Sequence, residues 1–464
     1  MDQTGSTHQP AINGPTVIYS RNVVFPERTT EATLFLEEGR ITKILLEKLA
    51  STKTLPVKDY GDSFIMPGLI DCHVHINDPG RTDWEGFETA TQAAAAGGIT
   101  TLIDMPLNSS PVTTTAHALE MKLNAAEGNL MVHCGFWGGI IPGNQKEIEP
   151  LILAGVMGFK VFLTHSGIDE FPNITLKELE ESLPLLAKYN LPLLVHAELD
   201  KKHVGQKELE ADNYSYRAWL HSRPRSWENE AIKGMINLCK KHNVRTHIVH
   251  LSSAEALQLI KDAKSNDIPL TVETCPHYLY FSAEKIPDSD TRFKCAPPIR
   301  EEENNRLLWN AVCDGTIDFV VTDHSPAPPE LKELETGNLK MAWGGIASLQ
   351  FSLQVIWTLA KQDGRSIEDV TRWMSTAVAD FLGMKNKGRI TEGADADLVI
   401  WSPSKKMKVN RTNIKFRHKV TPYEGEMLYG VIEETWVGGN KVYDKGAFVS
   451  SPAGNKLLKQ NERK

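Results

Sequence analysis

Eight short apolar runs, each followed by a stretch with helical spacing, constrain the fold of this chain more than any other feature. Alternating strand-length runs and amphipathic helices favour parallel strands with crossover helices, and eight such units favour a closed barrel. The eight runs are Leu69–His75, Ile99–Met105, Met131–Trp137, Val156–Leu163, Leu191–Ala197, Arg245–Leu251, Pro269–Thr274 and Ile317–Asp323. We therefore predict an α/β fold built on a TIM (β/α)₈ barrel over residues 67–384.

The segments between the runs carry apolar side chains at helical spacing and have Gly or Asn near their ends. Both features are typical of helices that pack one face against a sheet. The clearest examples predict helices within residues 86–98, 175–189, 228–242 and 253–265.

Both flanks of the barrel region are rich in strand-like sequence broken by turn residues. The strand-like pieces are 16–25 and 32–46 before the barrel, and 393–403 and 432–449 after it. We predict that residues 15–66 and 385–450 pair into one small β-sandwich-like domain. The chain ends, including 456–464, are expected to be frayed.

Charge and cysteine usage narrow the class of protein. The 51 basic and 59 acidic residues are mixed along the chain and give a net charge of -8, so neither a nucleic-acid groove nor a polybasic membrane patch is indicated. No apolar run is long enough to span a bilayer. Scattered cysteines and no recognisable signal peptide favour free thiols and a cytoplasmic location, although an organelle stays open. The cysteines are Cys72, Cys134, Cys239, Cys275, Cys295 and Cys313.

The first run ends in a His-x-His pair, His73 and His75. In a strand, residues i and i+2 project from the same face, so the two imidazoles would be offered side by side to one metal ion. A pair of half-buried strand histidines is the alternative that this motif alone leaves open.

Four further runs bear polar, metal-capable residues in or near their ends, which favours the metal interpretation. They are Lys160 in the fourth run, His196 in the fifth, His250 in the sixth and Asp323 in the eighth. The active sites of barrel enzymes lie at the carboxyl ends of the strands, where these residues would meet the His-x-His pair.

Lys160 stands in an otherwise apolar strand, where an ammonium is costly unless it is paired. An ion pair or an outward-reaching side chain is one interpretation. The other is that its nitrogen has taken up carbon dioxide to become a carbamate, whose two oxygens could bridge two metal ions holding a shared hydroxide.

Imidazole and carboxylate ligands suit zinc first and other first-row divalent ions second. Asp323 could both ligate an ion and carry a proton from the attacking water to the leaving nitrogen, although a lone Asp here could also cap a helix. Candidate substrate contacts are Asn108 and the backbone around Cys295 and Ser325, each of which could equally shape a loop. His277, at the end of the seventh run, is a further candidate that lines the pocket or has a structural role.

Several long stretches resemble the cyclic-amide hydrolase branch of the amidohydrolase superfamily. They are GLIDCHVHINDPG, GFKVFL, LLVHAE, IVHLSS and TDHSP, with GRITEGADADLVIW in the second flank. Within that branch, DPGRTDWEGFETATQAAAAGG, DMPLNS, FWGGIIP, KCAPPIR and WGGIASLQ resemble the allantoinases. The resemblance covers essentially the whole chain.

The resemblance implies a binuclear metal centre with a bridging hydroxide and with Lys160 carboxylated (N6-carboxylysine). The residues that match the family's ligands are His73, His75, Lys160, His196, His250 and Asp323. It implies hydrolysis of the hydantoin ring of (S)-allantoin to allantoate, a step of purine catabolism, by a homotetramer.

Two alternatives remain open. The first is a hydantoinase or dihydropyrimidinase activity, which is compatible with the same metal ligands; a dihydroorotase activity is disfavoured, because dihydroorotases carry an arginine for the substrate's carboxylate where this chain has Asn77. The second is a non-catalytic scaffold with the same barrel, but such relatives typically lose metal ligands, and all six positions are intact here.

Overall fold

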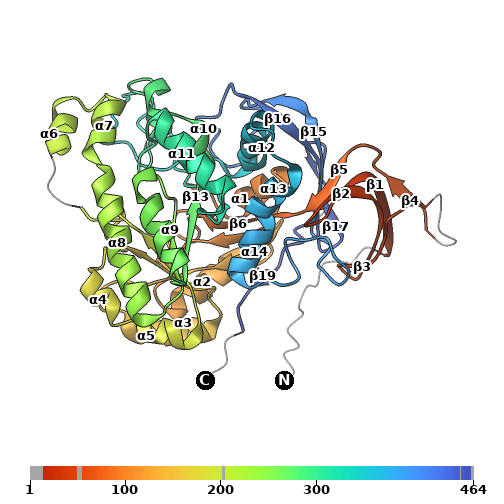
Figure 1. Ribbon diagram of the computed structural model, residues 1–464, viewed down its shortest axis with the longest axis horizontal. Helices are drawn as coiled ribbons and strands as arrows, with labels where there is room; N and C mark the ends of the chain where they lie inside the picture. Colours follow the sequence, from red (N-terminus) through yellow and green to blue (C-terminus); the bar gives the residue numbers. More distant parts are fainter. Residues whose placement is uncertain (1–13, 50–54, 201–203, 450, 461–464) are drawn as a thin grey trace.

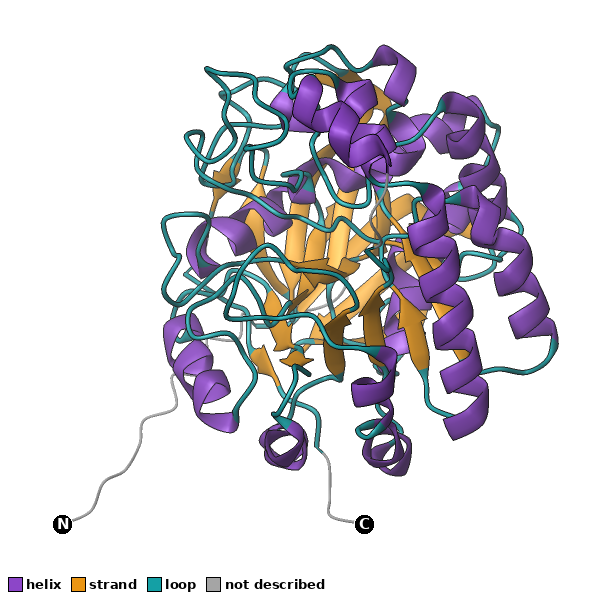
Figure 2. Ribbon diagram, turned by 90° about the vertical axis from the view of Figure 1, so that its left-hand side faces the viewer, coloured by secondary structure: helices purple, strands orange, loops and turns teal. Residues whose placement is uncertain are grey.

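The computed structural model describes residues 14–49, 55–200, 204–449 and 451–460. Parallel strands in the middle of the molecule are surrounded by helices, and a second sheet lies beside them (Figures 1 and 2). The barrel strands are β6 (Leu69–Val74), β7 (Ile99–Asp104), β8 (His133–Phe136), β9 (Gly138–Gly139), β10 (Phe159–Phe162), β11 (Leu193–His196), β12 (Thr246–Ile248), β13 (Leu270–Thr274) and β14 (Phe319–Val320).

Strand pairing follows the chain around the barrel. One sheet has the order β6-β7-β8 and the other β9-β10-β11-β12-β13-β14, and the described pairings between these strands are parallel. A parallel bridge between Val74 and His324 then joins the first strand to the chain that follows the last. All eight predicted runs contain a barrel strand, so the predicted barrel is confirmed.

The helices cover the outside of the barrel, with the long α8 and its neighbours α9 and α11 on one flank (Figure 1). Their bounds are α1 (Phe87–Ala96), α2 (Ala116–Ala126), α3 (Gln145–Ala154), α4 (Leu176–Glu180), α5 (Leu183–Tyr189), α6 (Val204–Ala211), α7 (Tyr216–Ser222), α8 (Arg225–His242), α9 (Leu257–Ser265), α10 (Pro276–Tyr280), α11 (Glu302–Cys313), α12 (Ser352–Gln362), α13 (Ile367–Thr371) and α14 (Ala377–Leu382).

The helix predicted within 175–189 is two helices, α4 and α5. Pro184 stands at the first turn of α5, where its missing N–H costs nothing, but it could not continue a helix from α4 without breaking a backbone hydrogen bond. Thr175 begins α4 with a capping box that includes Glu178.

A nine-stranded sheet combines both flanks of the chain, as predicted. The strands from the first flank are β1 (Thr16–Val24), β2 (Thr29–Glu37), β3 (Arg40–Leu45), β4 (Val57–Asp59) and β5 (Phe64–Pro67). Those from the second are β15 (Leu398–Lys408), β16 (Met427–Val437), β17 (Asn440–Asp444) and β18 (Ala447–Phe448). The antiparallel pairing of β15 with β5 joins the two flanks.

The chain end departs from the prediction of a frayed segment. β19 (Lys456–Leu457) pairs in parallel with β8 at Cys134 and Gly135, and the Cys134 N–H donates to the Asn455 carbonyl. Two residues after β19, the Lys459 N–H donates to the carbonyl of Gly155, which precedes β10, at 2.8 Å. The six cysteines are free, and no helix in the described part of the chain is long and apolar enough to cross a membrane.

Candidate active site

A cavity of about 420 Å³ opens at the carboxyl ends of the barrel strands, within the usual size range of small-molecule sites. All six residues proposed from the sequence as metal ligands line this cavity. They are His73 and His75 at the end of β6, Lys160 in β10, His196 at the end of β11, His250 after β12 and Asp323 after β14.

Three of these side chains form one cluster. The Nε2 atoms of His73 and His75 lie 3.1 and 3.5 Å from Oδ1 of Asp323. One nitrogen or oxygen from each of the three residues can be chosen so that all lie within 4.8 Å of one another, a spacing that suits a shared cation.

The second cluster stands next to the first. Nδ1 of His196 and Nε2 of His250 are 2.9 Å apart, and the rings of His73 and His250 have centroids 5.5 Å apart. The ring of Phe162 stacks on His196 at 4.6 Å, and Nζ of Lys160 lies 5.0 Å from the centroid of Phe162. Lys160 also interacts electrostatically with His73, His196 and His250, so it lies near both histidine groups.

The outward nitrogens of three histidines are held by hydrogen bonds. Nδ1 of His73 contacts the Glu273 carboxylate, Nδ1 of His75 lies 2.7 Å from the Leu107 carbonyl oxygen, and Nε2 of His196 lies 2.7 Å from Glu198. A proton on each outward nitrogen leaves the lone pair of the other nitrogen for the cavity. This is how metal-ligating histidines are oriented in proteins.

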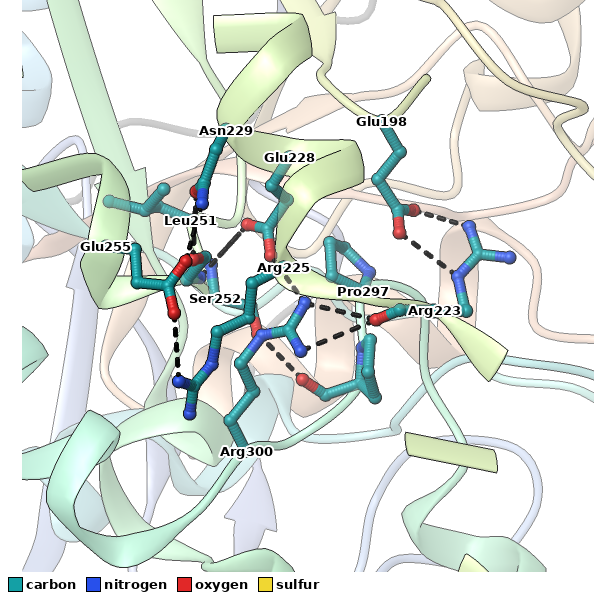
Figure 3. Close-up of polar contacts among 12 residues, drawn as sticks. Glu198, Arg223, Arg225, Glu228, Asn229, Leu251, Ser252, Glu255, Pro297 and Arg300 are labelled. Atoms are coloured by element: carbon teal, nitrogen blue, oxygen red, sulfur yellow. Dashed lines mark hydrogen bonds and ion pairs between the residues drawn. The ribbon is translucent and has the colours of Figure 1, made fainter. Parts of the chain in front are cut away.

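Glu198 is itself held by Arg223, whose guanidinium contacts both carboxylate oxygens (Figure 3). Burial opposes ionisation of Glu198, but Arg223 and His196 outweigh it and lower the pKa of Glu198 to about 2. Burial is likewise outweighed at Glu273, where His73 and His247 lower the pKa to about 2. Both carboxylates are therefore anions that favour protonation of the outward histidine nitrogens.

Arg300 extends this network beneath the loop that carries His250. Its guanidinium donates to the Arg223 carbonyl and to Glu228, with 2.9 Å between Nη2 and Oε2 of Glu228. The other oxygen of Glu228 accepts from the Ser252 N–H at 2.9 Å (Figure 3). Buried ionic contacts thus fix the backbone two residues beyond His250.

Lys160 is fully buried, and its Nζ has no hydrogen-bond partner among the described residues. Burial lowers the pKa of Lys160 to about 8, although Asp323 and Glu273 act in the other direction. At a pKa of about 8 roughly a tenth of the lysine is neutral at pH 7, far more than for an exposed lysine, and the neutral form is the one that can attack carbon dioxide.

Asp323 is an anion with strained backbone. Burial would raise its pKa, but His73, His75 and His250 hold it well below the ordinary value. Asp323 and His250 have φ angles of 46° and 39°, in the left-handed region that residues with a Cβ rarely adopt. Such strain is concentrated at functional sites, where surrounding contacts hold it in place.

The four proposed substrate contacts are placed differently. Asn108 and Ser325 line the cavity, and the Ser325 hydroxyl donates to Oδ1 of Asp323 at 3.1 Å. His277 and Cys295 are buried and are not among the residues that line it. Both ring nitrogens of His277 lack a partner among the described residues, and burial lowers its pKa to about 4.

Sequence reasoning missed the two carboxylates that orient the histidines. Glu273 stands in the apolar run of β13, where the argument that singled out Lys160 applies equally to a buried anion. Glu198 follows His196 by two residues and would share its face in a continued strand. His247 does not line the cavity, but its Nε2 lies 2.9 Å from the Glu273 carboxylate that holds His73.

The donor atoms that converge in this cavity fit divalent metal ions. Imidazole nitrogens and a carboxylate converge, their outer partners are in place, and the buried Lys160 nitrogen has no partner that would explain its position. The fit is better than that of a proton-relay cluster, which would not need five ligand-type side chains around one unpaired lysine.

The comparisons with known proteins agree with this fold and site. Residues 64–442 match the model of the amidohydrolase family, and the chain belongs to that family. It is 31% identical to an L-hydantoinase (dihydropyrimidinase) from Arthrobacter aurescens, with a TM-score of 0.89 over 96% of this chain and 99% of that one.

Sequence relatives narrow the comparison further. The chain is 46% identical to an allantoinase of Streptomyces avermitilis over 96% of its own length and 98% of the relative's. An allantoinase of Arabidopsis thaliana is 43% identical over 95% of this chain and 90% of the relative. An allantoinase of Saccharomyces cerevisiae is 42% identical over 96% of this chain and 95% of the relative. The chain is thus a member of the amidohydrolase family that is similar to allantoinases along nearly its whole length.

Proposed function

We propose that this protein hydrolyses the hydantoin ring of allantoin to give allantoate. The convergence of the six side chains on one cavity floor carries the hydrolytic proposal, and the allantoinases that match nearly the whole chain support the substrate. We further propose that Lys160 is carboxylated: the neutral amine attacks carbon dioxide, an N–C bond forms, and the nitrogen releases a proton.

The ligands of two metal ions in this proposal are His73, His75, Lys160, His196, His250 and Asp323. Two divalent ions there, zinc by ligand chemistry, would polarise the scissile carbonyl and make a water molecule nucleophilic at neutral pH. The chain's own residues supply the rest of the chemistry.

Asp323 is the proposed proton carrier. Its lowered pKa keeps the carboxylate ionised, which is the form that can accept the proton of the attacking water. It then returns that proton to the ring nitrogen as the C–N bond breaks. Ser325 orients the carboxylate through its hydrogen bond to Oδ1, while Glu198 and Glu273 hold the imidazoles in one tautomer.

The charges of the cavity favour a neutral substrate. The guanidinium of Arg223 is engaged by both oxygens of Glu198, and the ammonium of Lys294 donates to the carbonyls of Lys340 and Ala342. A substrate carboxylate would therefore compete with existing contacts for either cation. Allantoin carries no carboxylate, whereas dihydroorotate does.

Ring opening tests the proposal directly. Purified protein loaded with zinc is incubated separately with allantoin, hydantoin and dihydroorotate, and the ring-opened acids are quantified. Turnover of allantoin with the highest kcat/KM is expected. A preference for hydantoin would assign a hydantoinase-type activity, and turnover of dihydroorotate alone would contradict the proposed substrate. Failure of the protein to retain zinc, together with no hydrolysis of any of the three compounds, would favour a scaffold.

The assembly and location are part of the same proposal. By resemblance to the family we propose a homotetramer, which sedimentation velocity of the purified protein tests. The cytoplasmic location that the sequence favours stays a prediction, and one relative, from Aquarana catesbeiana and 45% identical over 79% of this chain, is described as mitochondrial.

A further inference from the structure

Two buried lysines bind the backbone of one segment of the cavity wall, residues 340–345, whose members Met341 to Gly345 line the cavity. Nζ of Lys294 donates to the carbonyl oxygens of Lys340, at 3.1 Å, and of Ala342. Nζ of Lys332 donates to the carbonyl oxygens of Trp343 and Gly345, at 3.0 and 2.8 Å. Four carbonyls of a six-residue segment are thus held by two ammonium groups.

Burying these two cations without carboxylates is costly. Lys294 and Lys332 are 6% and 4% exposed, and within the described residues neither ammonium forms an ion pair. Burial lowers the pKa of Lys294 to about 7, with Lys332 adding to the effect, and lowers the pKa of Lys332 to about 8. An apolar side chain of similar length would avoid this cost, so packing alone does not account for either residue.

The two lysines approach the segment from different sides. Lys294 lines the main cavity, with its Nζ 4.6 Å from the centroid of Trp219. Lys332 does not line that cavity but lines a separate, small one together with Ser325 and Gly345. The Gly345 N–H also donates to the Lys294 carbonyl at 2.8 Å.

Other contacts connect the segment with the rest of the site. Trp343 packs edge-to-face on Trp84, with ring centroids 4.8 Å apart. Gly345 has a φ of 129° and approaches Ser325 so closely that an added Cβ would lie 2.5 Å from the Ser325 carbonyl oxygen. Since Ser325 donates to Asp323, a displaced segment would also disturb the residue that carries the proton.

We propose that Lys294 and Lys332 are positioning residues for the hydrolysis: together they fix residues 340–345 as the wall against which the cyclic-amide substrate binds. They act through the segment rather than on the reacting atoms. The inference rests on the proposed function for its kinetic assay, but not for its structural one.

Lys294→Met and Lys332→Met, which keep the length of the side chain and remove its donors, test the proposal in the metal-loaded, full-length protein. Both are expected to lower kcat/KM for allantoin by about tenfold or more, chiefly through KM, because the wall is no longer held in place. Amide hydrogen exchange of a peptide covering 340–345 should become faster in both variants.

Lys387→Met is the matched control. Lys387 is also a buried lysine, at 8% exposure, but it pairs with Asp397 and Asp395 at the junction of the barrel and the nine-stranded sheet. Its removal should lower the melting temperature without changing KM or the exchange of 340–345. If a Met variant does not fold, the corresponding Gln variant, which keeps one N–H donor group, takes its place and should give an intermediate KM.

The outcomes separate the possible roles. An effect on KM in Lys294→Met alone would mean that Lys294 contacts the substrate directly, and it would overturn the positioning role. A normal KM in both variants, with only a melting-temperature loss like that of Lys387→Met, would also overturn it. If the wild-type protein does not open allantoin, the proposed function fails. The positioning role is then still tested by the amide hydrogen exchange of residues 340–345 and by the KM for whichever cyclic amide the protein opens.

Discussion

At the scale of single residues, the site contains buried ionisable side chains whose desolvation cost is explained by their proposed role in binding metal ions. Lys160 is a buried amine without a partner among the described residues, and Glu273 is a buried anion whose two oxygens contact His73 and His247. Neither would be retained for stability, because an apolar residue of similar volume would pack without a desolvation cost. Substitution of each residue tests whether it acts in the proposed metal site or only supports the fold.

Lys160→Ala is expected to abolish hydrolysis, because the bridge between the proposed ions is lost with the side chain. Short-chain carboxylates such as acetate or propionate should restore part of the activity by occupying the space that the side chain leaves. Rates are measured against carboxylate concentration with zinc present. Lys188→Ala, at an exposed lysine, is the control and should behave as wild type. Full activity of Lys160→Ala without added carboxylate would remove the carbamate from the mechanism.

Glu273→Gln is expected to weaken metal binding by roughly 10- to 100-fold, because an amide no longer fixes the tautomer of His73 as an anion does. Competition with a chromogenic chelator measures the affinity without relying on activity. Glu434→Gln replaces a similarly buried glutamate, in β16, where it contacts Lys58 and Tyr60 far along the chain from the candidate ligands. Unchanged zinc affinity in Glu273→Gln, relative to Glu434→Gln, would contradict the orienting role.

At the scale of elements, the barrel was predictable because each strand is a continuous apolar run and each helix has an apolar face. The metal-ligand candidates were predictable for the same reason, since polar residues stand out in or at the ends of such runs. β19 was not, because Leu457 and Leu458 are the only apolar residues in the charged stretch 456–464, and the pairing of β19 is with β8, more than 300 positions away. Glu198 and Glu273 could have been singled out as charged residues in or next to apolar runs, but the sequence does not show that they contact His196 and His73.

β19 gives a prediction at this scale. Leu457 is partly buried and packs against core side chains of the barrel, whereas its neighbour Leu458 is 43% exposed. Leu457→Asp should lower the free energy of unfolding by about 2 kcal/mol, through lost apolar burial and a poorly solvated carboxylate. Leu458→Asp should leave it nearly unchanged. Urea unfolding followed by tryptophan fluorescence measures both, and equal stabilities would mean that the segment contributes nothing to the fold.

For the whole molecule, the junction between the barrel and the nine-stranded sheet is electrostatic as well as apolar. Asp397 precedes β15, and its carboxylate contacts Lys387, the Gly438 N–H at 2.8 Å and His133 of β8 at 3.5 Å. It therefore joins the second flank of the chain to the barrel. The sequence predicted that the two flanks pair, but a side-chain contact of this kind depends on the docking of the sheet and carries no sequence signal.

The same residue gives the stability of the molecule a pH dependence. Burial would raise the pKa of Asp397, but Lys387 and His133 outweigh it and hold the pKa well below the ordinary value of about 3.9. As pH falls below about 4, the unfolded chain binds a proton at this position that the folded chain does not, so the stabilisation present above that pH is progressively lost. Asp397→Asn should therefore be destabilised by roughly 3 kcal/mol at pH 7, with a smaller difference from wild type at pH 3.5. Urea unfolding of both proteins at the two pH values measures the difference, and a gap that stays constant or widens at pH 3.5 would show that the carboxylate charge does not join the sheet to the barrel.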